Sequence, residues 1–258
     1  MAALWNGACI PGAVMDPIWV TAASGMRARM EALDVLGNNI ANAATDGYKG
    51  DRELYNLHFS NASRYPNSTV ALPVIEGQWT DFSQGLLQTT DNPLDFALRG
   101  DGFFAVNGPS GPLYTRSGSF RLSKTGTLET KEGYTVRLAG VDGPLKVEGN
   151  DPIEVSADGS VRQAGQTLGR LEVVRFDDEK VLSKQAGSFF EANRGAKPVA
   201  ADGADVLQGK VEASNVSSAD SAVRIVSVMR QFEMLQKAIS LASEMDRQII
   251  HEVAKVGQ

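Results

Sequence analysis

The chain is poor in the residues that build covalent, metal-binding or membrane-spanning structures. It has one cysteine, Cys9, in 258 residues, which excludes an intrachain disulfide. Neither of its two histidines, His58 and His251, has companion ligands at the spacing of a zinc site. No run of about 18 apolar residues occurs, so we expect no membrane-spanning helix. The sequence predicts no metal site and no cofactor.

Basic clusters and aromatic residues are also scarce. The net charge is −6, and neither a basic arm nor a cluster of Lys and Arg is present. The composition therefore gives no general attraction to nucleic acid or to anionic lipid. Aromatic residues make up 7% of the chain, which disfavours a stacking platform for sugars or nucleotides. We expect no nucleic-acid partner.

No combination of side chains predicts an enzyme. Cys9 has no neighbouring base that would activate a nucleophile. His251 is interpreted as an exposed residue near a helix end. Asp101 and Asp158 each precede a glycine, and turn formation accounts for both. The acidic run at residues 177–179 is interpreted as a solvated loop, with weak calcium binding as the alternative.

What the sequence does contain is a pair of apolar stripes, one at each end of the chain. Both stripes step by alternating threes and fours, which averages 3.5 residues and is typical of a helix that faces a partner helix. One polar residue interrupts each stripe, Arg29 in the first and Asp246 in the second. The first stripe comprises Met15, Trp19, Ala22, Met26, Arg29, Leu33, Leu36, Ile40 and Ala43. The second comprises Ile225, Val228, Phe232, Leu235, Ile239, Ala242, Asp246, Ile249, Val253 and Val256.

These stripes predict helices over residues 17–43 and from about 217 to 256. Between them, short apolar runs are separated by Asp-Gly pairs, which indicates antiparallel strands joined by tight turns. We therefore predict an α+β protein in which long N- and C-terminal helices form a coiled-coil-like helical domain around a mainly antiparallel β middle domain. The helices could pair within one chain, with other subunits, or both.

Composition along the chain suggests five segments. The opening segment lacks a basic start and a sustained apolar core, so it is a poor signal peptide, and Met15 is a plausible first residue. The predicted segments are a disordered leader (1–14), the N-terminal helix (15–47), an extended connector arm (48–90), a β-rich middle domain (91–215) and the C-terminal helix (216–258).

The end of the first predicted helix carries a distinctive motif. It reads Leu36-Gly37-Asn38-Asn39-Ile40-Ala41-Asn42-Ala43-Ala44-Thr45-Asp46-Gly47-Tyr48-Lys49. This stretch resembles the N-terminal signature of bacterial flagellar rod and hook proteins, N-N-[LIVM]-A-N-x-x-T-x-G-[YF]-K. Every fixed position is present: Asn38, Asn39, Ile40, Ala41, Asn42, Thr45, Gly47, Tyr48 and Lys49. Three further stretches look like the same family, at residues 91–104, 114–120 and 209–216.

The resemblance implies a structural subunit of the bacterial flagellar basal-body rod in the periplasm. It implies export through the flagellar type III apparatus without a cleavable signal peptide. In such proteins the terminal helices pack, with copies of themselves and other rod proteins, into the inner wall of a hollow tube, and the β-rich domain faces outward. We expect an assembly seam formed by Trp19, Met26, Leu33, Leu36, Ile225, Val228, Phe232, Leu235, Ile239, Ile249 and Val253.

Within this family, the length and the single β-rich domain fit rod proteins and not the longer hook protein. Arg230-Gln231-Phe232-Glu233-Met234, with Lys237, looks closer to the proximal rod protein, because the distal rod protein typically has Arg-Ala-Tyr-Glu at this place. The distal rod protein stays as an alternative. A third hypothesis, from another class, is an extracellular adhesive or binding module whose helices form a stalk.

The motif also has a physical interpretation of its own. Asparagines are poor helix formers, and Asn38 and Asn42 lie four residues apart on one helix face. Their amides could bond the following turn or a neighbouring subunit, or they could only cap the helix. Gly47 is expected to adopt a positive φ, which Thr45 and Tyr48 could not adopt cheaply.

Overall fold

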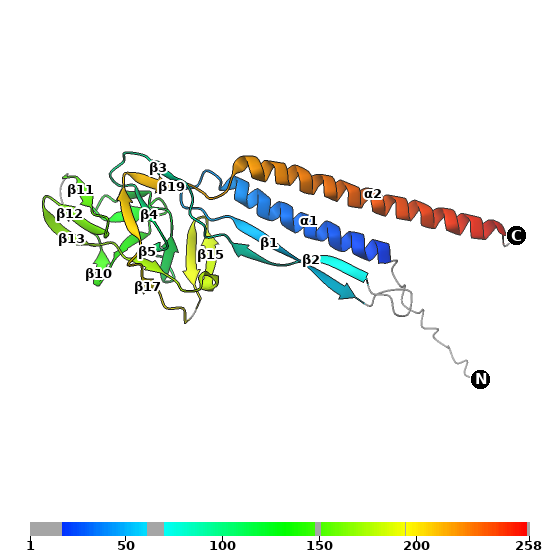
Figure 1. Ribbon diagram of the computed structural model, residues 1–258, viewed down its shortest axis with the longest axis horizontal. Coiled ribbons are helices and arrows are strands. Elements are labelled where there is room, and N and C mark those ends of the chain that lie inside the picture. The colour runs from blue at the N-terminus through cyan, green and yellow to red at the C-terminus, as the bar shows by residue number, and fades with distance from the viewer. Residues whose placement is uncertain (1–16, 61–69, 148–150, 194, 257–258) are drawn as a thin grey trace, which may run out of the picture. The chain divides into compact units, whose positions relative to one another are not determined.

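The computed structural model describes residues 17–60, 70–147, 151–193 and 195–256 (Figure 1). The predicted leader, residues 1–14, and Met15 lie outside these ranges. The two predicted terminal helices are confirmed as α1 (Pro17–Ala41) and α2 (Ser218–Val256). A short 3-10 helix, η1, spans Glu179–Val181. Neither α1 nor α2 combines the length and apolarity needed to cross a membrane.

Between the two helices, every regular element of the described chain except η1 is a strand. They are β1 (Asp51–Ser60), β2 (Val70–Thr80), β3 (Leu87–Thr89), β4 (Phe96–Arg99), β5 (Phe103–Asn107), β6 (Pro112–Thr115), β7 (Phe120–Leu122), β8 (Leu128–Thr130), β9 (Thr135–Leu138), β10 (Val141–Pro144), β11 (Ile153–Val155), β12 (Ser160–Gln163), β13 (Gln166–Arg170), β14 (Val173–Arg175), β15 (Leu182–Ala186), β16 (Phe189–Ala192), β17 (Val199–Ala200), β18 (Asp205–Gln208) and β19 (Lys210–Glu212).

The chain divides into two compact units. Among the described residues, the helical unit comprises 17–36, 53–60, 70–78 and 222–256, and the β unit comprises 37–52, 79–147, 151–193 and 195–221. Residues 48–90, for which the sequence predicts an extended connector, contain β1, β2 and β3. The predicted domain boundaries otherwise stay a prediction.

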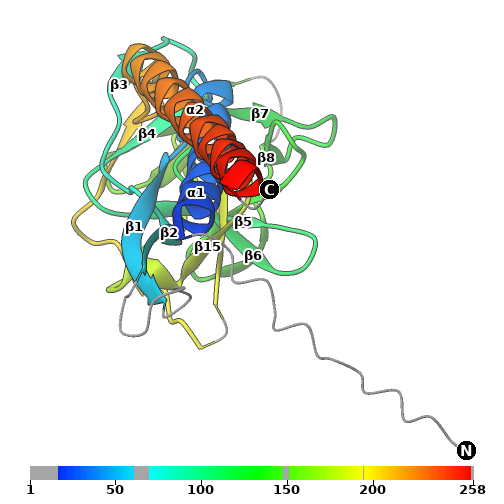
Figure 2. The same ribbon diagram turned by 90° about the vertical axis from the view of Figure 1, so that its right-hand side faces the viewer.

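In the helical unit, α1 packs against both α2 and the β1–β2 hairpin. Figures 1 and 2 show α1 lying beside α2 on one side and beside the hairpin on the other. Gly25 marks the close approach, because a Cβ atom there would lie 3.2 Å from Leu235 Cδ1 and 3.8 Å from Pro73 Cγ. Ala32, Leu36 and Val228 form the buried core of this unit.

The predicted coiled-coil-like helical domain is wrong. The described residues contain only two α-helices, and the unit that holds them also contains a β-hairpin. The seam residues Trp19, Met26 and Leu33 are only half-buried. Five apolar side chains of α1 are buried: Ala22, Ala28, Ala32, Val35 and Leu36. Ala22 and Leu36 belong to the predicted stripe, but Ala28, Ala32 and Val35 lie about 120° round the helix from it. Because α1 has two neighbours, its buried face lies between them, where small alanines permit close packing.

The β unit is built on one large antiparallel sheet, and the prediction of an antiparallel β middle is confirmed. Its main strand order is β15-β16-β6-β5-β9-β8-β7, with β10 beside β9 and with β14 pairing both β5 and β17. A second sheet has the order β11-β12-β13. The predicted turn at Asp158-Gly159 joins β11 to β12, and Gly159 has a φ of 83°.

Strand β5 is central because both of its faces are buried. Successive side chains of a strand point to opposite faces. Phe104 and Val106 therefore enter one core cluster, and Phe103 and Ala105 enter another. Phe103 packs edge-on against Phe82, with ring centroids 5.6 Å apart. This doubly covered strand gives the β unit a rigid frame for the site described next.

Candidate functional site

The residues that the sequence analysis weighed for catalysis or metal binding are spread over different elements and turns. No group of three His, Cys, Asp or Glu side chains among the described residues could hold a metal ion. His58 lies exposed on β1, and His251 lies exposed on α2. Asp101 and Asp158 are exposed, and Asp178 caps η1 through its bond from the Lys180 backbone N–H. Cys9 lies outside the described residues.

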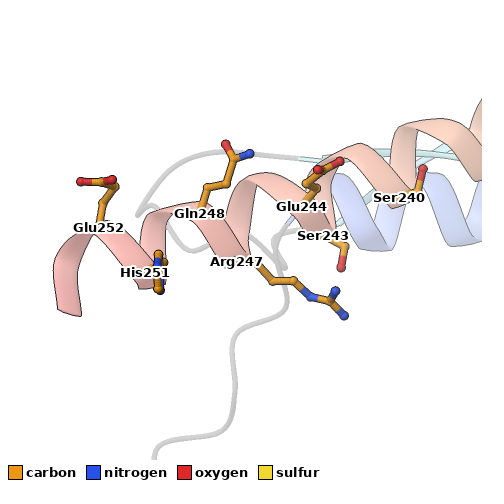
Figure 3. A pocket seen from close by; sticks show the side chains of 7 residues that line it. All are labelled: Ser240, Ser243, Glu244, Arg247, Gln248, His251 and Glu252. Carbon is orange, nitrogen blue, oxygen red and sulfur yellow. The ribbon is translucent and has the colours of Figure 1, made fainter. Parts of the chain in front are cut away.

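A hollow on α2 is also unsuited to a small molecule. It has a volume of about 790 Å³ and is lined by Ser240, Ser243, Glu244, Arg247, Gln248, His251 and Glu252. All seven belong to α2, and Figure 3 shows their side chains spreading outward from that single helix. Ligand pockets gather side chains that converge on an enclosed volume. This hollow is therefore part of an open helix surface and not an enclosed pocket.

The asparagine motif instead forms a hydrogen-bonded joint at the end of α1. Asn42 Nδ2 donates to Asn38 Oδ1 at 2.9 Å, which confirms that the two side chains share one face. The Asn39 amide bonds the backbone of Asp51 in both directions, at 2.7 Å to the carbonyl and 2.9 Å from the N–H. The Tyr48 hydroxyl lies 3.1 Å from Asn38 Oδ1. The motif therefore does more than cap a helix, because it attaches the helix end to the start of β1.

Gly47 allows the chain to turn within this joint. Its φ is 67°, which confirms the predicted positive value. Its N–H donates to the Glu212 carbonyl at 2.6 Å. A Cβ atom on Gly47 would lie 2.1 Å from the Ser117 backbone nitrogen, a distance that only a backbone shift could relieve.

We expect Gly47→Ala to destabilise the β unit by about 3 kcal/mol, because left-handed strain adds to a backbone clash. Urea unfolding of the purified chain measures the change. Gly37→Ala is the matched control, because Gly37 lies in a helix with no atom within 4 Å of its would-be Cβ. That control should be neutral or slightly stabilising. Equal stability of the two variants would contradict the assigned role of Gly47.

A buried charge cluster lies directly beside the motif. Lys49 Nζ lies 2.6 Å from Glu212 Oε1, and both side chains are 0% exposed. The Lys49 ammonium also donates to the Ser83 carbonyl at 2.7 Å. Arg116 donates to the Gly100 carbonyl at 2.9 Å and lies 3.5 Å from Glu212 Oε2. We call Lys49, Arg116 and Glu212 the charge hub.

Electrostatics in the charge hub depend on Glu212. Burial lowers the pKa of Lys49 from its usual value, and Glu212 opposes that shift. Burial likewise lowers the pKa of Arg116, and Glu212 again favours the charged form. One carboxylate thus stabilises two buried cations. Burial, with a smaller contribution from Asp51, raises the pKa of the adjacent Tyr48 to about 12, so its hydroxyl remains protonated even at a pH where an exposed tyrosine ionises.

Two more side chains complete the joint from distant parts of the sequence. Asn215 Oδ1 accepts from the Gly50 N–H at 2.8 Å, and its Nδ2 donates to the Asp81 carbonyl at 2.7 Å. Lys184 Nζ donates to Asp51 Oδ2 at 2.7 Å and lies 4.3 Å from the Tyr48 ring centroid. The backbone that follows the motif is therefore held by several separate segments of the β unit.

The sequence analysis missed the charge hub as a unit, although it had singled out its parts. Lys49 belongs to the asparagine motif, Arg116 to the stretch at 114–120, and Glu212 with Asn215 to the stretch at 209–216. The four family-like stretches meet here, because Arg116 also bonds Gly100 and lies over Phe103, 5.2 Å from its ring centroid. The signal available in the sequence was that each of these residues lies inside one of the family-like stretches.

The predicted seam residues of α2 lie on its inner face. Val228 is buried, and Ile225, Phe232, Leu235 and Ile239 are half-buried. On α1, Leu36 is buried, as stated above for the core of the helical unit. The side chains of Ile249 and Val253 lie outside what the structure describes. Leu33, Leu36, Ile225 and Val228 therefore pack together within the helical unit, and Leu235 faces Gly25. Assembly through the seam stays a prediction.

The hairpin contributes polar and cationic contacts to the same unit. Arg224 on α2 pairs with Glu53 on β1 at 3.1 Å, and the Glu53 side chain is 2% exposed. The Arg29 guanidinium lies 5.3 Å from the Tyr55 ring centroid. Arg29, which interrupts the predicted apolar stripe, therefore makes a cation–π contact with Tyr55 of β1.

Comparison with known proteins identifies similar chains along most of the sequence. Three family models match: "Flagella basal body rod protein" over residues 20–49, "Flagellar hook protein FlgE/F/G D1 domain" over 97–163, and "Flagellar basal body rod FlgEFG protein C-terminal" over 207–251. Each matched segment supplies one residue of the charge hub.

Individual relatives are similar over nearly their whole length. The flagellar basal-body rod protein FlgF of Caulobacter vibrioides is 29% identical, covering 93% of this chain and 99% of that protein. FlgF of Mesorhizobium japonicum is 32% identical, covering 85% and 90%. The rod protein FlgG of Caulobacter vibrioides is 32% identical, covering 87% and 95%.

Proposed function

Because this chain belongs to the flagellar basal-body rod protein family and is a structural subunit of the rod, we propose that it polymerises through its terminal helices into the wall of a hollow axial shaft. In this proposal residues 15–47 and 216–258 act together as the assembly domain, and residues 91–215 form the outward middle domain. Partners are further copies of the chain and other rod proteins.

The observation that carries this proposal is the amount of apolar surface left on long helices. Helix α2 has 39 residues, or about 58 Å, against 25 residues in α1. Large apolar side chains of α2 remain exposed, among them Val223, Met234 and Leu241. Monomeric proteins rarely expose apolar stripes of this kind, and helices normally bury them against a partner.

The charge hub and the asparagine motif add a second observation. They fix the last turn of α1, from residue 37 on, among the strands of the β unit to which that turn belongs. The buried Lys49–Glu212 pair and the Asn39–Asp51 bonds hold the end of α1 in the β unit. We infer a mechanical role without catalysis, cofactor or metal.

Within the rod we propose the proximal part. The stretch at residues 230–234, with Lys237, supports this placement, whereas FlgF and FlgG relatives match the chain about equally well. The distal rod is the second candidate, since FlgG of Caulobacter vibrioides is 32% identical. The chain would reach the basal body through the flagellar type III apparatus, without removal of a signal peptide.

Deletion of the gene, followed by motility scoring and isolation of hook–basal bodies, tests the proposal. We expect a non-motile strain without an intact rod, rescued only by a chain that keeps both α1 and α2. The stage at which assembly stops separates the proximal from the distal rod. Normal basal bodies and normal swimming in the deletion strain would contradict a role in the rod.

A further inference from the structure

Helix α2 carries a second apolar stripe on the side opposite its inner face. At 100° per residue, this stripe lies about 160° round the helix from the seam residues. Its members are Val223, Val226, Arg230, Met234, Lys237, Leu241 and Met245, and all seven are exposed. Met234 is 61% exposed and Leu241 is 60% exposed. We call this set the outer face of α2.

Helix α1 has an exposed face of matching spacing. Its members within the helical unit are Ala23, Arg27, Met30 and Asp34, which step by four, three and four. Met30 is 57% exposed although it stands in the middle of the helix. Neither Asp34 nor Arg230 has an ion-pair partner among the described residues. We call this set the outer face of α1.

We propose that the outer face of α1 in one copy docks antiparallel on the outer face of α2 in a neighbouring copy. The proposal rests on the rod assembly proposed above and names the surface and the partner that assembly uses. With Met30 placed opposite Met234, Asp34 comes one turn away opposite Arg230. In the same register Ala23 lies opposite Leu241, so a small side chain leaves room for a large one.

Charge and spacing favour a second copy of the chain as the occupant. The Asp34–Arg230 pairing supplies charge complementarity, and the positions of both faces step by four, three and four, so they stay in phase. The same register places Arg27 opposite Lys237, and the Glu31 carboxylate, which pairs with Arg27 at 2.9 Å, would lie beside these two cations. A hollow of about 560 Å³ on this face is lined only by α2 residues, an open shape that suits a helix.

The register also defines the geometry of the neighbour. Within one chain, Gly25 of α1 lies against Leu235 of α2. In the proposed contact, residue 29 of the neighbour's α1 would lie level with the same Leu235. The two copies therefore sit side by side with a shift of about 6 Å along the helix axis. Because α1 of one copy meets α2 of the next, the contact is head-to-tail and can repeat around a shaft.

Charge reversal tests the pairing in the deletion strain with full-length chains. Asp34→Arg and Arg230→Asp should each lower swimming and rod yield about 10-fold or more, and the double variant should restore most of both. Arg247→Asp is the matched control, because Arg247 is equally exposed on α2 but lies about 100° round the helix from Arg230. Melting curves of the purified variants should match the unaltered chain.

Two outcomes would overturn the docking proposal. Single variants that swim as well as Arg247→Asp would show that this contact is not used. Single variants that fail without rescue in the double variant would show that the two residues do not meet. Either outcome leaves the rod function standing if the unaltered gene still rescues the deletion strain, so the two proposals are separately testable.

Disulfide cross-linking gives a direct second measurement. Two differently tagged chains, both carrying Cys9→Ser, receive Met30→Cys in one and Met234→Cys in the other. Oxidation of isolated basal bodies should link the two tags, whereas Arg247→Cys in place of Met234→Cys should not. Absence of the link, or a link to a different rod protein instead, would overturn the assignment of a second copy as the partner.

Discussion

Replacing Leu235 with aspartate is expected to abolish rod assembly and swimming while the β unit stays folded. Leu235 is half-buried on the inner face of α2, where its Cδ1 contacts α1 at Gly25. A carboxylate there would be desolvated without a partner, which is among the most destabilising single changes. Helix α2 would leave α1, and no ordered helix pair would remain to assemble.

A matched control separates the position from the charge. Gln236 is the next residue and is exposed, so Gln236→Asp introduces the same group without burying it. Swimming, hook–basal body yield and limited proteolysis of the purified chain are the measurements. We expect Gln236→Asp to behave as the unaltered chain. Normal rods in the Leu235→Asp strain, or proteolytic loss of the β unit in that variant, would contradict the prediction.

Replacing Glu212 with alanine should destabilise the β unit by about 3–5 kcal/mol, the usual cost of removing one partner of a buried ion pair. The change leaves the Lys49 ammonium at 0% exposure without its counter-charge, and it removes the acceptor of the Gly85 N–H. Arg116 also loses its nearest carboxylate. For a chain of this size we expect Tm to fall by roughly 10 °C.

Calorimetry or denaturant unfolding of the purified chain measures this effect. Glu129→Ala is the control, because Glu129 pairs with Arg121 at 2.9 Å at the protein surface, where Arg121 is 56% exposed. Surface pairs of this kind contribute about 1 kcal/mol or less. A Glu212→Ala variant no less stable than Glu129→Ala would show that the charge hub does not hold the joint together.

Several features of the fold could be predicted because they depend on neighbours in the sequence. The apolar stripes gave both helices, and the Asp-Gly pairs indicated antiparallel strands, since period and turn chemistry are local properties. The prediction of a coiled-coil-like domain was wrong about which face of α1 is buried. The heptad interpretation predicted that Trp19 and Met26 face the partner helix, whereas the structure buries Ala32 in a cluster with Val228 of α2, against which Ile75 of β2 packs.

For the candidate site, too, some features depend on neighbours in the sequence and others on the tertiary structure. The sequence by itself determined the family, the asparagine motif, the positive φ at Gly47 and the two helices, because each is written in a short stretch of residues. Only the tertiary structure decided that Lys49 meets Glu212, 163 positions away, and that Arg116 joins them. It also decided which face of each helix is buried and which remains open. Such contacts depend on the path of the whole chain, which no local period or motif encodes.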